Sequence, residues 1–333
     1  MTVRYALLAA AILALIAVPY AITEQYYVNI ASQILLYAVF ALGLNVLVGY
    51  GGLVSLGHAG LSGAASYAAA YLLAAGHGHV VAIAGALAAG LLTTAGFAAL
   101  SLRASGISFI MITLALGEII WGLAYRWISI TNGDNGISVA TRPAPFGLSL
   151  ASADGFYDAT LIVFLIAVAA CAIFVHSPFG AALAGTRDQP RRMNALGFHV
   201  WMIRFWAFMF SGLLSAVAGI LFVYYNEFIS PQALALTASA EGLLMVISGG
   251  AGTLLGPVVG AALVVIVKNV VSAYIARWNF LLGAIFVLIV VFMPEGLVPG
   301  SVRLFRGAWR RAHRPKSAAA SAAAPTPAGA PKP

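Results

Sequence analysis

The sequence predicts an all-α protein that crosses a membrane many times, and three observations support this fold class. Hydrophobic residues make up 62% of the 333 residues and charged residues only 8%. The mean hydropathy is +0.99, which is more apolar surface than a soluble fold of this size can hide from water. The apolar residues also form runs about as long as a membrane-spanning helix.

About ten runs have roughly the 20 residues that a helix needs to cross a hydrocarbon core about 30 Å thick. They are predicted as spans at Tyr5–Ile22, Ile30–Tyr50, Ala59–Ala75, Val80–Leu102, Ile107–Tyr125, Ala159–His176, Phe205–Tyr225, Leu236–Gly249, Gly256–Tyr274 and Phe280–Met293. The first is interpreted as a retained span, because "PYAITEQ" after it offers no small-x-small signal cleavage site. The eighth is short and interrupted by glycine, so it is a candidate re-entrant segment.

Lysine and arginine counts in the short loops predict the orientation, because cytoplasmic loops carry the excess of both. With both termini in the cytoplasm, that side collects Arg4, Arg103, Arg187, Arg191, Arg192, Arg204, Arg303, Arg306, Arg310, Arg311, Arg314, Lys316 and Lys332. The outside keeps Arg126, Arg142 and Arg277, and Lys268 is expected to extend from its span toward the outer interface. The net charge of +8 therefore reflects membrane orientation, and no basic stripe with exposed aromatics indicates a nucleic-acid partner.

The stretch "GTRDQPRRMNALG", Gly185–Gly197, is a charged island between long apolar runs. Pro190 suits the first turn of a helix, which Asp188 or Gln189 can cap. Gly197 can end that helix in the left-handed conformation. A helix of about two turns is too short to be stable alone, so it lies against anionic lipid headgroups or docks to a cytoplasmic partner.

Longer stretches of the chain resemble one family of transporters. "SPFGAALAGTRDQPRRMNALGFHVWMIRFWAFMFSGLLSAVAGILFVYY" is similar to the cytoplasmic loop and following helix of the inner-membrane permease subunits of branched-chain amino-acid ABC transporters, specifically the M-type (LivM-like) subunit. Further segments match in order: "LNVLVGYGGLVSLGHAGLSGAASY", "GISFIMITLALGEI", "TNGDNGI" and "EGLLMVISGGAGTLLGPVVGAAL". The resemblance covers nearly the whole membrane portion and implies the ABC importer permease fold.

This resemblance implies that the segment from about Gly180 to Gly197, within the cytoplasmic stretch 177–204, is the coupling helix that sits in a groove of the ATP-binding subunit. The residues implied in ATPase coupling are Gly180, Thr186, Arg187, Asp188, Gln189, Pro190, Arg191, Arg192, Ala195, Leu196 and Gly197. Ala182 and Ala184 stand where the family often carries basic residues, so the contact is expected to be less electrostatic here. The implied partners are a homologous second permease subunit, two ATP-binding subunits and a periplasmic substrate-binding protein, in a bacterial inner membrane.

The sequence lacks the signatures of an ATP-binding or enzymatic chain. An ATP-binding element places lysine directly after glycine, but Lys268, Lys316 and Lys332 all follow other residues. No His/Cys/Asp/Glu cluster has metal-ligand spacing, and no nucleophile–base pattern stands out. We therefore expect no enzyme activity, metal or cofactor in this chain; ATP is bound by partner subunits, whose closure moves the spans as rigid bodies. The single Cys171 falls in an apolar run and is interpreted as a packing residue.

A glycine-rich segment, "VGYGGLVSLGHAGLSGAA", is the first candidate for the solute pathway. Close helix packing explains most of its glycines, but a Gly–Gly pair can also break a helix near the midplane and expose backbone dipoles to a solute. The candidates are Asn45, Gly51, Gly52, Ser55 and His58, of which Asn45 and His58 also suit a packing hydrogen bond. A similar pattern in "SGGAGTLLGPVVGAA" aligns Gly51 with Gly250 and Gly57 with Gly256, which indicates a weak internal repeat.

Two carboxylates inside predicted spans complete the pathway candidates, because ionisable groups in a membrane are costly and often functional. Glu118 lies well inside the fifth span, where it either lines the pathway or is neutralised by protonation or a helix–helix hydrogen bond. Glu241 lies nearer an end of the eighth, where solvation is the simpler interpretation.

The permease domain is predicted over residues 1–294. Its longest outside loop, 126–158, is polar with Gly, Asn and Pro turns. By the resemblance it is a docking surface for the binding protein, and a plain surface loop is the alternative. Residues 295–333 are basic and then Ala/Pro-rich, which predicts a disordered cytoplasmic tail whose arginines contact anionic lipid.

The sequence thus predicts a permease subunit of an ABC importer for branched-chain or related amino acids. Related subunits carry urea, amides or aromatic acids on the same scaffold, so these substrates stay open. The competing class is an ion-coupled secondary transporter or channel with Glu118 as its proton or ion site, and a neighbouring ATPase gene would discriminate the two. A membrane enzyme is disfavoured because no reactive cluster is present.

Overall fold

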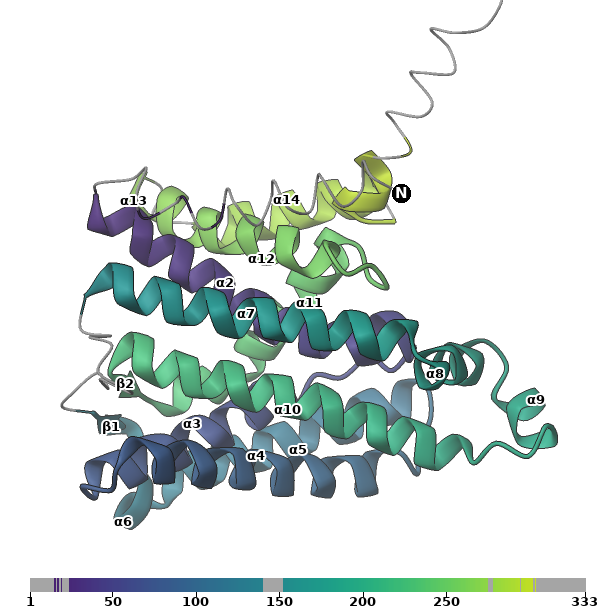
Figure 1. Cartoon of the computed structure of the whole chain (residues 1–333), viewed down its shortest axis with the longest axis horizontal. Helices are drawn as coiled ribbons and strands as arrows, with labels where there is room; N and C mark the ends of the chain where they lie inside the picture. The colour runs from purple at the N-terminus through teal and green to yellow at the C-terminus, as the bar shows by residue number, and fades with distance from the viewer. Residues whose placement is uncertain are drawn as a thin grey trace, which may run out of the picture.

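The computed structural model describes residues 24–139, 152–274, 278–293 and 295–301, with residues 15, 17, 19 and 303 individually. In these parts the chain is a bundle of helices that run side by side (Figure 1). A two-stranded sheet lies at one end of the bundle, and two short helices, α8 (Pro178–Asp188) and α9 (Pro190–Ala195), project from the other. We call these the sheet end and the α8–α9 end.

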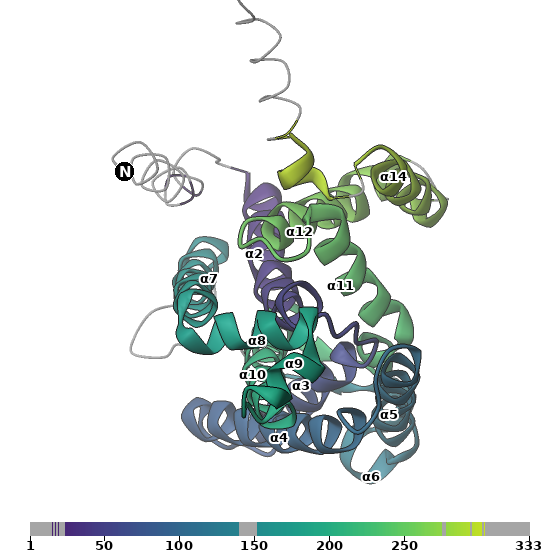
Figure 2. The same ribbon diagram turned by 90° about the vertical axis from the view of Figure 1, so that its right-hand side faces the viewer.

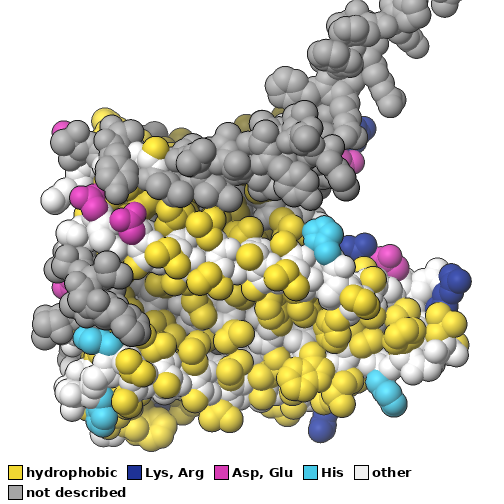
Figure 3. Space-filling model, viewed as in Figure 1, with side chains coloured by type: hydrophobic (Ala, Val, Ile, Leu, Met, Phe, Trp, Pro, Cys, Tyr) yellow, Lys and Arg dark blue, Asp and Glu magenta, His cyan; other side chains and the backbone are white. Residues whose placement is uncertain are grey.

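Within the described residues, five helices are long and apolar enough to cross a membrane. They are α2 (Gln25–Asn45) continued by the π-helix η1 (Val46–Tyr50), α4 (His79–Ser101), α5 (Ile107–Arg126), α7 (Ala153–His176) and α10 (Val200–Asn226). Hydrophobic side chains cover most of the face between the two ends, as expected of a surface that meets lipid (Figure 3).

Other apolar helices are shorter than these five. They are α3 (His58–Ala74), α11 (Leu236–Gly249), α12 (Gly256–Ile266) continued by the π-helix η5 (Val267–Val271) and α13 (Ser272–Tyr274), and α14 (Trp278–Phe292). With 14 residues, α11 is about 21 Å long at 1.5 Å per residue, which is shorter than a hydrocarbon core. The predicted first span lies almost wholly outside the described residues, so the total of ten crossings stays a prediction.

Polar residues at helix starts explain why some helices begin before the predicted spans. α7 begins at Ala153 and not at Ala159, because Ser152 caps it by accepting a hydrogen bond from the Gly155 N–H at 3.1 Å. The predicted outside loop 126–158 is therefore partly wrong, since its last residues are helical. Its first part contains α6 (Ile128–Thr131), a 3₁₀ turn and strand β1, while residues 140–151 lie outside the described residues.

The sheet joins two connections that are far apart in the sequence. Strand β1 (Ile137–Ser138), after α5, pairs antiparallel with β2 (Phe228–Ile229), after α10. Ile137 faces Ile229 in the register, and both side chains are buried. A 3₁₀ helix, η4 (Pro231–Leu234), then leads into α11.

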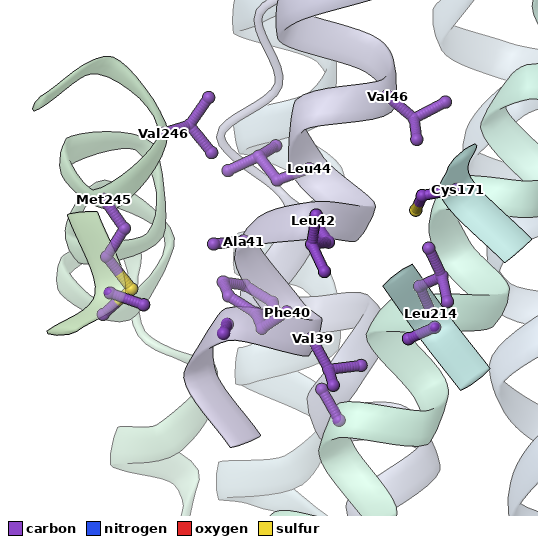
Figure 4. Packing of buried hydrophobic residues seen from close by; sticks show 14 of the residues in the cluster. Val39, Phe40, Ala41, Leu42, Leu44, Val46, Cys171, Leu214, Met245 and Val246 are labelled. Atoms are coloured by element: carbon purple, nitrogen blue, oxygen red, sulfur yellow. The ribbon is translucent and has the colours of Figure 1, made fainter. Parts of the chain in front are cut away.

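Helix α2 forms the centre of the core, between α7, α10, α11 and α12 (Figure 2). Its most apolar window is 78% buried, against 28% for α4 and for α7. Figure 4 shows Val39 and Leu42 of α2 packed with Leu214 of α10, and Met245 of α11 on the other side. Cys171 of α7 belongs to the same cluster and is 1% exposed, which confirms that it packs.

Charge separates the two ends of the bundle. On the face shown in Figure 3, Asp and Glu gather at the sheet end, and Lys and Arg gather mainly toward the α8–α9 end. This distribution agrees with the predicted division of the loops, whereas the direction of either end relative to a membrane stays a prediction. Of the tail, residues 295–301 pack near Gly250, and nearly all of the remainder lies outside the described residues.

Candidate functional site

The predicted coupling segment folds as two helices where a single short helix was predicted. α8 begins at Pro178, and the Ser177 hydroxyl caps it by accepting from the Gly180 N–H at 3.2 Å. Pro190 occupies the first turn of α9, and Gly197 after this helix has a φ of 86°, both as predicted. The predicted side-chain cap of α9 is wrong, because the side chain of its N-cap residue makes no such hydrogen bond.

The predicted coupling residues divide into an outer and an inner set. The exposed set is Arg187, Asp188, Gln189, Arg191, Arg192, Ala195, Leu196 and Gly197, and Pro190 is half-buried. Gly180 and Thr186 are buried against the bundle. A Cβ at position 180 would overlap the carbonyl groups of Phe174 and Val175, so only glycine allows α8 to turn this closely beneath α7. The inner set holds the segment in place, and the outer set forms its surface.

Arg187 joins α8 to η1 and to the glycine-rich break that follows it. Its Nη1 donates a hydrogen bond to the Gly49 carbonyl oxygen at 2.8 Å, and its Nε donates to Asp188 Oδ1 at 2.9 Å. Gly52, whose φ is 66°, faces the aliphatic part of the same side chain, and a Cβ there would overlap Arg187 Cγ. The structure therefore brings together two segments that were predicted separately, one for coupling and one for the pathway.

A second arginine holds α8 against α10. Arg204 Nη2 donates to the Thr186 carbonyl oxygen at 2.6 Å, and Arg204 Nε is buried without a hydrogen-bond partner in the described part of the chain. Sequence reasoning counted Arg204 only as a cytoplasmic charge. The contact depends on α8 folding back along α10, which no local pattern predicts.

The end of α2 and the following η1 touch the break between α11 and α12. Gly49 packs against Gly252 so closely that a Cβ at position 49 would overlap its backbone. The Asn45 side chain, 1% exposed, accepts from the Gly252 N–H and donates to the Thr253 carbonyl oxygen, both at 2.9 Å. The aligned glycines Gly51 and Gly250 each follow directly on a helix end, and Asn45 connects the end of α2 to the break between α11 and α12; the internal repeat itself stays a prediction.

His58 is buried at the start of α3, and both of its ring nitrogens have partners. Nδ1 lies 2.9 Å from Ser55 Oγ, and Nε2 lies 2.9 Å from Ser211 Oγ on α10. Ser211 donates its only hydroxyl hydrogen to the Gly43 carbonyl oxygen at 2.6 Å, so it must accept from Nε2–H. In the neutral imidazole with its hydrogen on Nε2, Nδ1 is the acceptor, and the Ser55 hydroxyl can donate to it. This network favours the packing interpretation of His58 and Ser55.

A cavity of about 410 Å³ lies between α2, α3, α10 and α11, toward the sheet end. Glu241 of α11 and Lys268 of η5 line it, and Lys268 Nζ lies 3.0 Å from Glu241 Oε2. The predicted extension of Lys268 toward the outer interface stays a prediction; its side chain is 35% exposed, and its ammonium group pairs with the Glu241 carboxylate. Glu241 is correspondingly paired and only partly solvated.

Glu118 contacts neither the His58 network nor the cavity with Glu241 and Lys268. It is half-buried on α5, next to Gly117, which packs against Gly57 and brings α5 close to α3. Glu118 does not line the cavity, and in the described part of the chain no hydrogen bond or ion pair reaches it. The structure therefore leaves its predicted pathway role without a supporting contact.

Sequence reasoning missed three partners of the candidate residues: Ser211 of His58, Thr253 of Asn45 and Lys268 of Glu241. Serine and threonine in apolar runs carry no distinctive signal, so the first two were not predictable. Lys268 and Glu241 did carry a sequence signal. They are opposite charges in consecutive predicted spans, and forming an ion pair avoids the cost of an unpaired charge in the membrane. Over the described residues no three His, Cys, Asp or Glu side chains gather as a metal site requires.

Comparisons with known proteins agree with the resemblance read from the sequence. The family described as "Branched-chain amino acid transport system / permease component" matches residues 26–290. The chain is 30% identical over 325 residues to the high-affinity branched-chain amino acid transport system permease protein LivM of Escherichia coli (strain K12), which covers 90% of this chain and 76% of that protein.

Two further relatives extend this comparison. LivM of Salmonella typhimurium (strain LT2) is 30% identical over 298 residues, or 82% of this chain and 70% of that protein. The autoinducer 2 import system permease protein LsrC of Yersinia enterocolitica is 32% identical over 139 residues, or 39% of each chain. No solved structure matches the chain.

Proposed function

The chain belongs to the family of permease components of branched-chain amino acid transport systems, and from that premise we propose that it is a membrane-spanning subunit of an ATP-driven importer of branched-chain amino acids. Separate subunits hydrolyse ATP, so this chain acts as a transporter and not as an enzyme. Its partners are two ATP-binding subunits, a homologous second permease subunit and a periplasmic binding protein.

One observation supports the mechanism above all others, the bond between Arg187 and the Gly49 carbonyl oxygen. The α8–α9 segment projects beyond the bundle, where a partner can reach it (Figure 1). Because Arg187 joins this segment to the break after η1, displacement of α8 acts directly on that break. Asn45 transmits the displacement to Gly252 in the break between α11 and α12, so the spans on either side move together.

The surface of the α8–α9 end suits a protein partner. Arg191 and Arg192 are exposed there, next to large exposed apolar side chains. Leu196 is 64% exposed, and Phe198 and Trp201 are exposed as well. Aromatic and apolar side chains with arginine at their rim are typical of protein–protein interfaces. We assign this patch to the ATP-binding subunit, which puts the α8–α9 end and both termini in the cytoplasm of a bacterial inner-membrane protein.

ATP hydrolysis by the co-purified complex in lipid nanodiscs tests the proposal. We compare the wild type with the double variant Arg191→Glu and Arg192→Glu, and expect the reversal to abolish the stimulation by loaded binding protein or to release the ATP-binding subunits. Arg103→Glu is the matched control, since Arg103 is an exposed arginine after α4 at the same end but outside α8 and α9. If the control and the double variant show the same stimulated ATP hydrolysis and the same subunit assembly, the assignment of the patch to the ATP-binding subunit is refuted.

Measuring which solutes stimulate ATP hydrolysis distinguishes the remaining alternatives. Leucine, isoleucine and valine are expected to drive hydrolysis, whereas stimulation by urea, an amide or an aromatic acid alone would place the chain among importers of those solutes. Purified chain that moves amino acid across a membrane without ATP would overturn the importer proposal. Glu118 would then be the first residue to replace.

A further inference from the structure

The cavity between α2, α3, α10 and α11 opens toward the sheet end, opposite the α8–α9 segment. Asn226, Phe228 and Gln232 are exposed at its mouth, whereas Ala59 and Ser66 at its wall are buried. Its volume of about 410 Å³ falls in the range of small-molecule sites, which begins near about 300 Å³. A solute of a few heavy atoms can therefore enter from the side where a binding protein would deliver it.

The lining pairs one cation and one anion with an apolar wall. The Glu241 carboxylate and the Lys268 ammonium lie 3.0 Å apart, with side chains that are 23% and 35% exposed. Leu36, Phe40 and Phe222 supply the apolar part of the lining. The pair thus presents both signs of charge to the same partly desolvated space, where charge-assisted hydrogen bonds are stronger than in water.

The backbone around Lys268 is also unusual. Lys268 lies in the π-helix η5 (Val267–Val271), and π-helical turns are rare and frequent at functional sites. Asn269 in the same turn donates to Gln33 Oε1 of α2 at 2.6 Å and to the Val265 carbonyl oxygen at 2.9 Å, which holds the turn against α2. The ammonium group is therefore carried on a positioned element and not on a free helix surface.

We propose that this cavity is a binding site within the single chain for a zwitterionic α-amino acid with an apolar side chain. The ligand's carboxylate accepts hydrogen bonds from Lys268 Nζ, and its ammonium group donates to the Glu241 carboxylate. The side chain rests against Phe40 and Phe222. Bound in this way, the ligand's two charges replace the protein's own ion pair with two pairs, so neither buried charge is left without a partner.

The choice of amino acid rests on the proposed function, but the site is tested without ATP. The complex in nanodiscs is illuminated with photo-leucine, a diazirine analogue that keeps the zwitterion, and labelled peptides are identified by mass spectrometry. We expect labels on α2, α3 or α10 around the cavity, and competition by leucine. 4-Methylpentanoate, which lacks the ammonium group, and 3-methylbutylamine, which lacks the carboxylate, are expected to compete at least tenfold more weakly.

Variants separate a ligand role from a structural ion pair. Glu241→Gln and Lys268→Met are each expected to weaken leucine competition by on the order of tenfold or more. Glu24→Gln, the same change at an exposed position before α2 and outside the cavity, is expected to change it less than about twofold. The exchanged pair, Glu241→Lys with Lys268→Glu, keeps the ion pair but places each charge against the wrong end of the ligand.

The outcomes are distinguishable. If the exchanged pair restores labelling and competition to the wild-type level, the ion pair is structural and the proposal is refuted. Labelling that falls only outside the cavity, or that Glu241→Gln leaves unchanged in a folded complex, refutes it as well. Labelling in the cavity without amino-acid-dependent ATP hydrolysis supports this binding site and refutes the importer. Amino-acid-dependent hydrolysis without labelling in the cavity supports the importer and refutes this binding site.

Discussion

Replacing Asn45 by alanine tests whether this side chain holds the end of α2 against the break between α11 and α12. The Asn45 side chain occupies a fully buried position, where it accepts from the Gly252 N–H and donates to the Thr253 carbonyl oxygen. Neither backbone group makes a helical backbone hydrogen bond, because both lie in the turn between α11 and α12. Alanine removes both hydrogen bonds and leaves a partly buried donor and a partly buried acceptor without partners.

The expected loss follows from those two groups. An unsatisfied buried donor or acceptor costs about 1–3 kcal/mol, and these two partly buried groups fall at the low end, so the variant is expected to lose about 2–3 kcal/mol of unfolding free energy. At about 2 °C per kcal/mol for a chain of this size, the apparent midpoint of thermal unfolding falls by roughly 4–6 °C. The loss concerns folding and the contact between the end of α2 and the break between α11 and α12, and it requires no ligand.

Thermal unfolding of the purified chain, followed by tryptophan fluorescence, measures this loss. Asn226→Ala is the matched control, because the exposed Asn226 amide bonds only the Phe222 carbonyl oxygen of its own helix, at 3.0 Å. The control is expected to stay within about 0.5 kcal/mol of the wild type. If Asn45→Ala shifts the midpoint by less than about 2 °C, the Asn45 contact contributes nothing and the reasoning is wrong.

Two further substitutions test the contacts of α8 and α10. Arg187→Met keeps the aliphatic packing but removes the bond to Gly49, so transport per ATP hydrolysed is expected to fall several-fold while the ATP-binding subunits stay bound; an unchanged ratio in proteoliposomes would contradict the transmission mechanism. Ser211→Ala leaves the buried His58 Nε2–H without its acceptor, whereas the Gly43 carbonyl oxygen keeps the Val46 N–H, so the variant is expected to lose about 1–3 kcal/mol in thermal unfolding. Ser215→Ala, in which the lost hydroxyl bonded only the Ser211 carbonyl oxygen, is the control, and equal losses in both variants would argue against the network.

Local rules predicted local structure well. Pro190 and Gly197 bound α9 because one fixes a helical φ and the other tolerates a positive φ. The helix break at Gly51 and Gly52 followed from the same properties of glycine. Hydropathy identified the long helices but placed several starts too late, since a helix continues into polar residues such as those before Ala159 that a hydropathy count excludes.

Contacts between distant segments were beyond the same rules. Arg187 and Gly49 are 138 positions apart, and nothing in either neighbourhood specifies the other. Glu241 and Lys268 are 27 positions apart on consecutive apolar runs, where the cost of burying single charges could have indicated a pair. Packing of whole helices decides these contacts, and the sequence of one helix does not contain that information.

The buried position of Cys171 makes the chain suitable for site-directed spectroscopy. It is the only cysteine of the sequence and is 1% exposed within the core, so thiol reagents are expected to leave the native protein unlabelled. A cysteine introduced at exposed Asn194 on α9 or at exposed Ser138 on β1 would then carry the only probe at that end of the bundle. A pair of spin labels at these two positions would report the movement of one end relative to the other during ATP turnover, without the removal of any native residue.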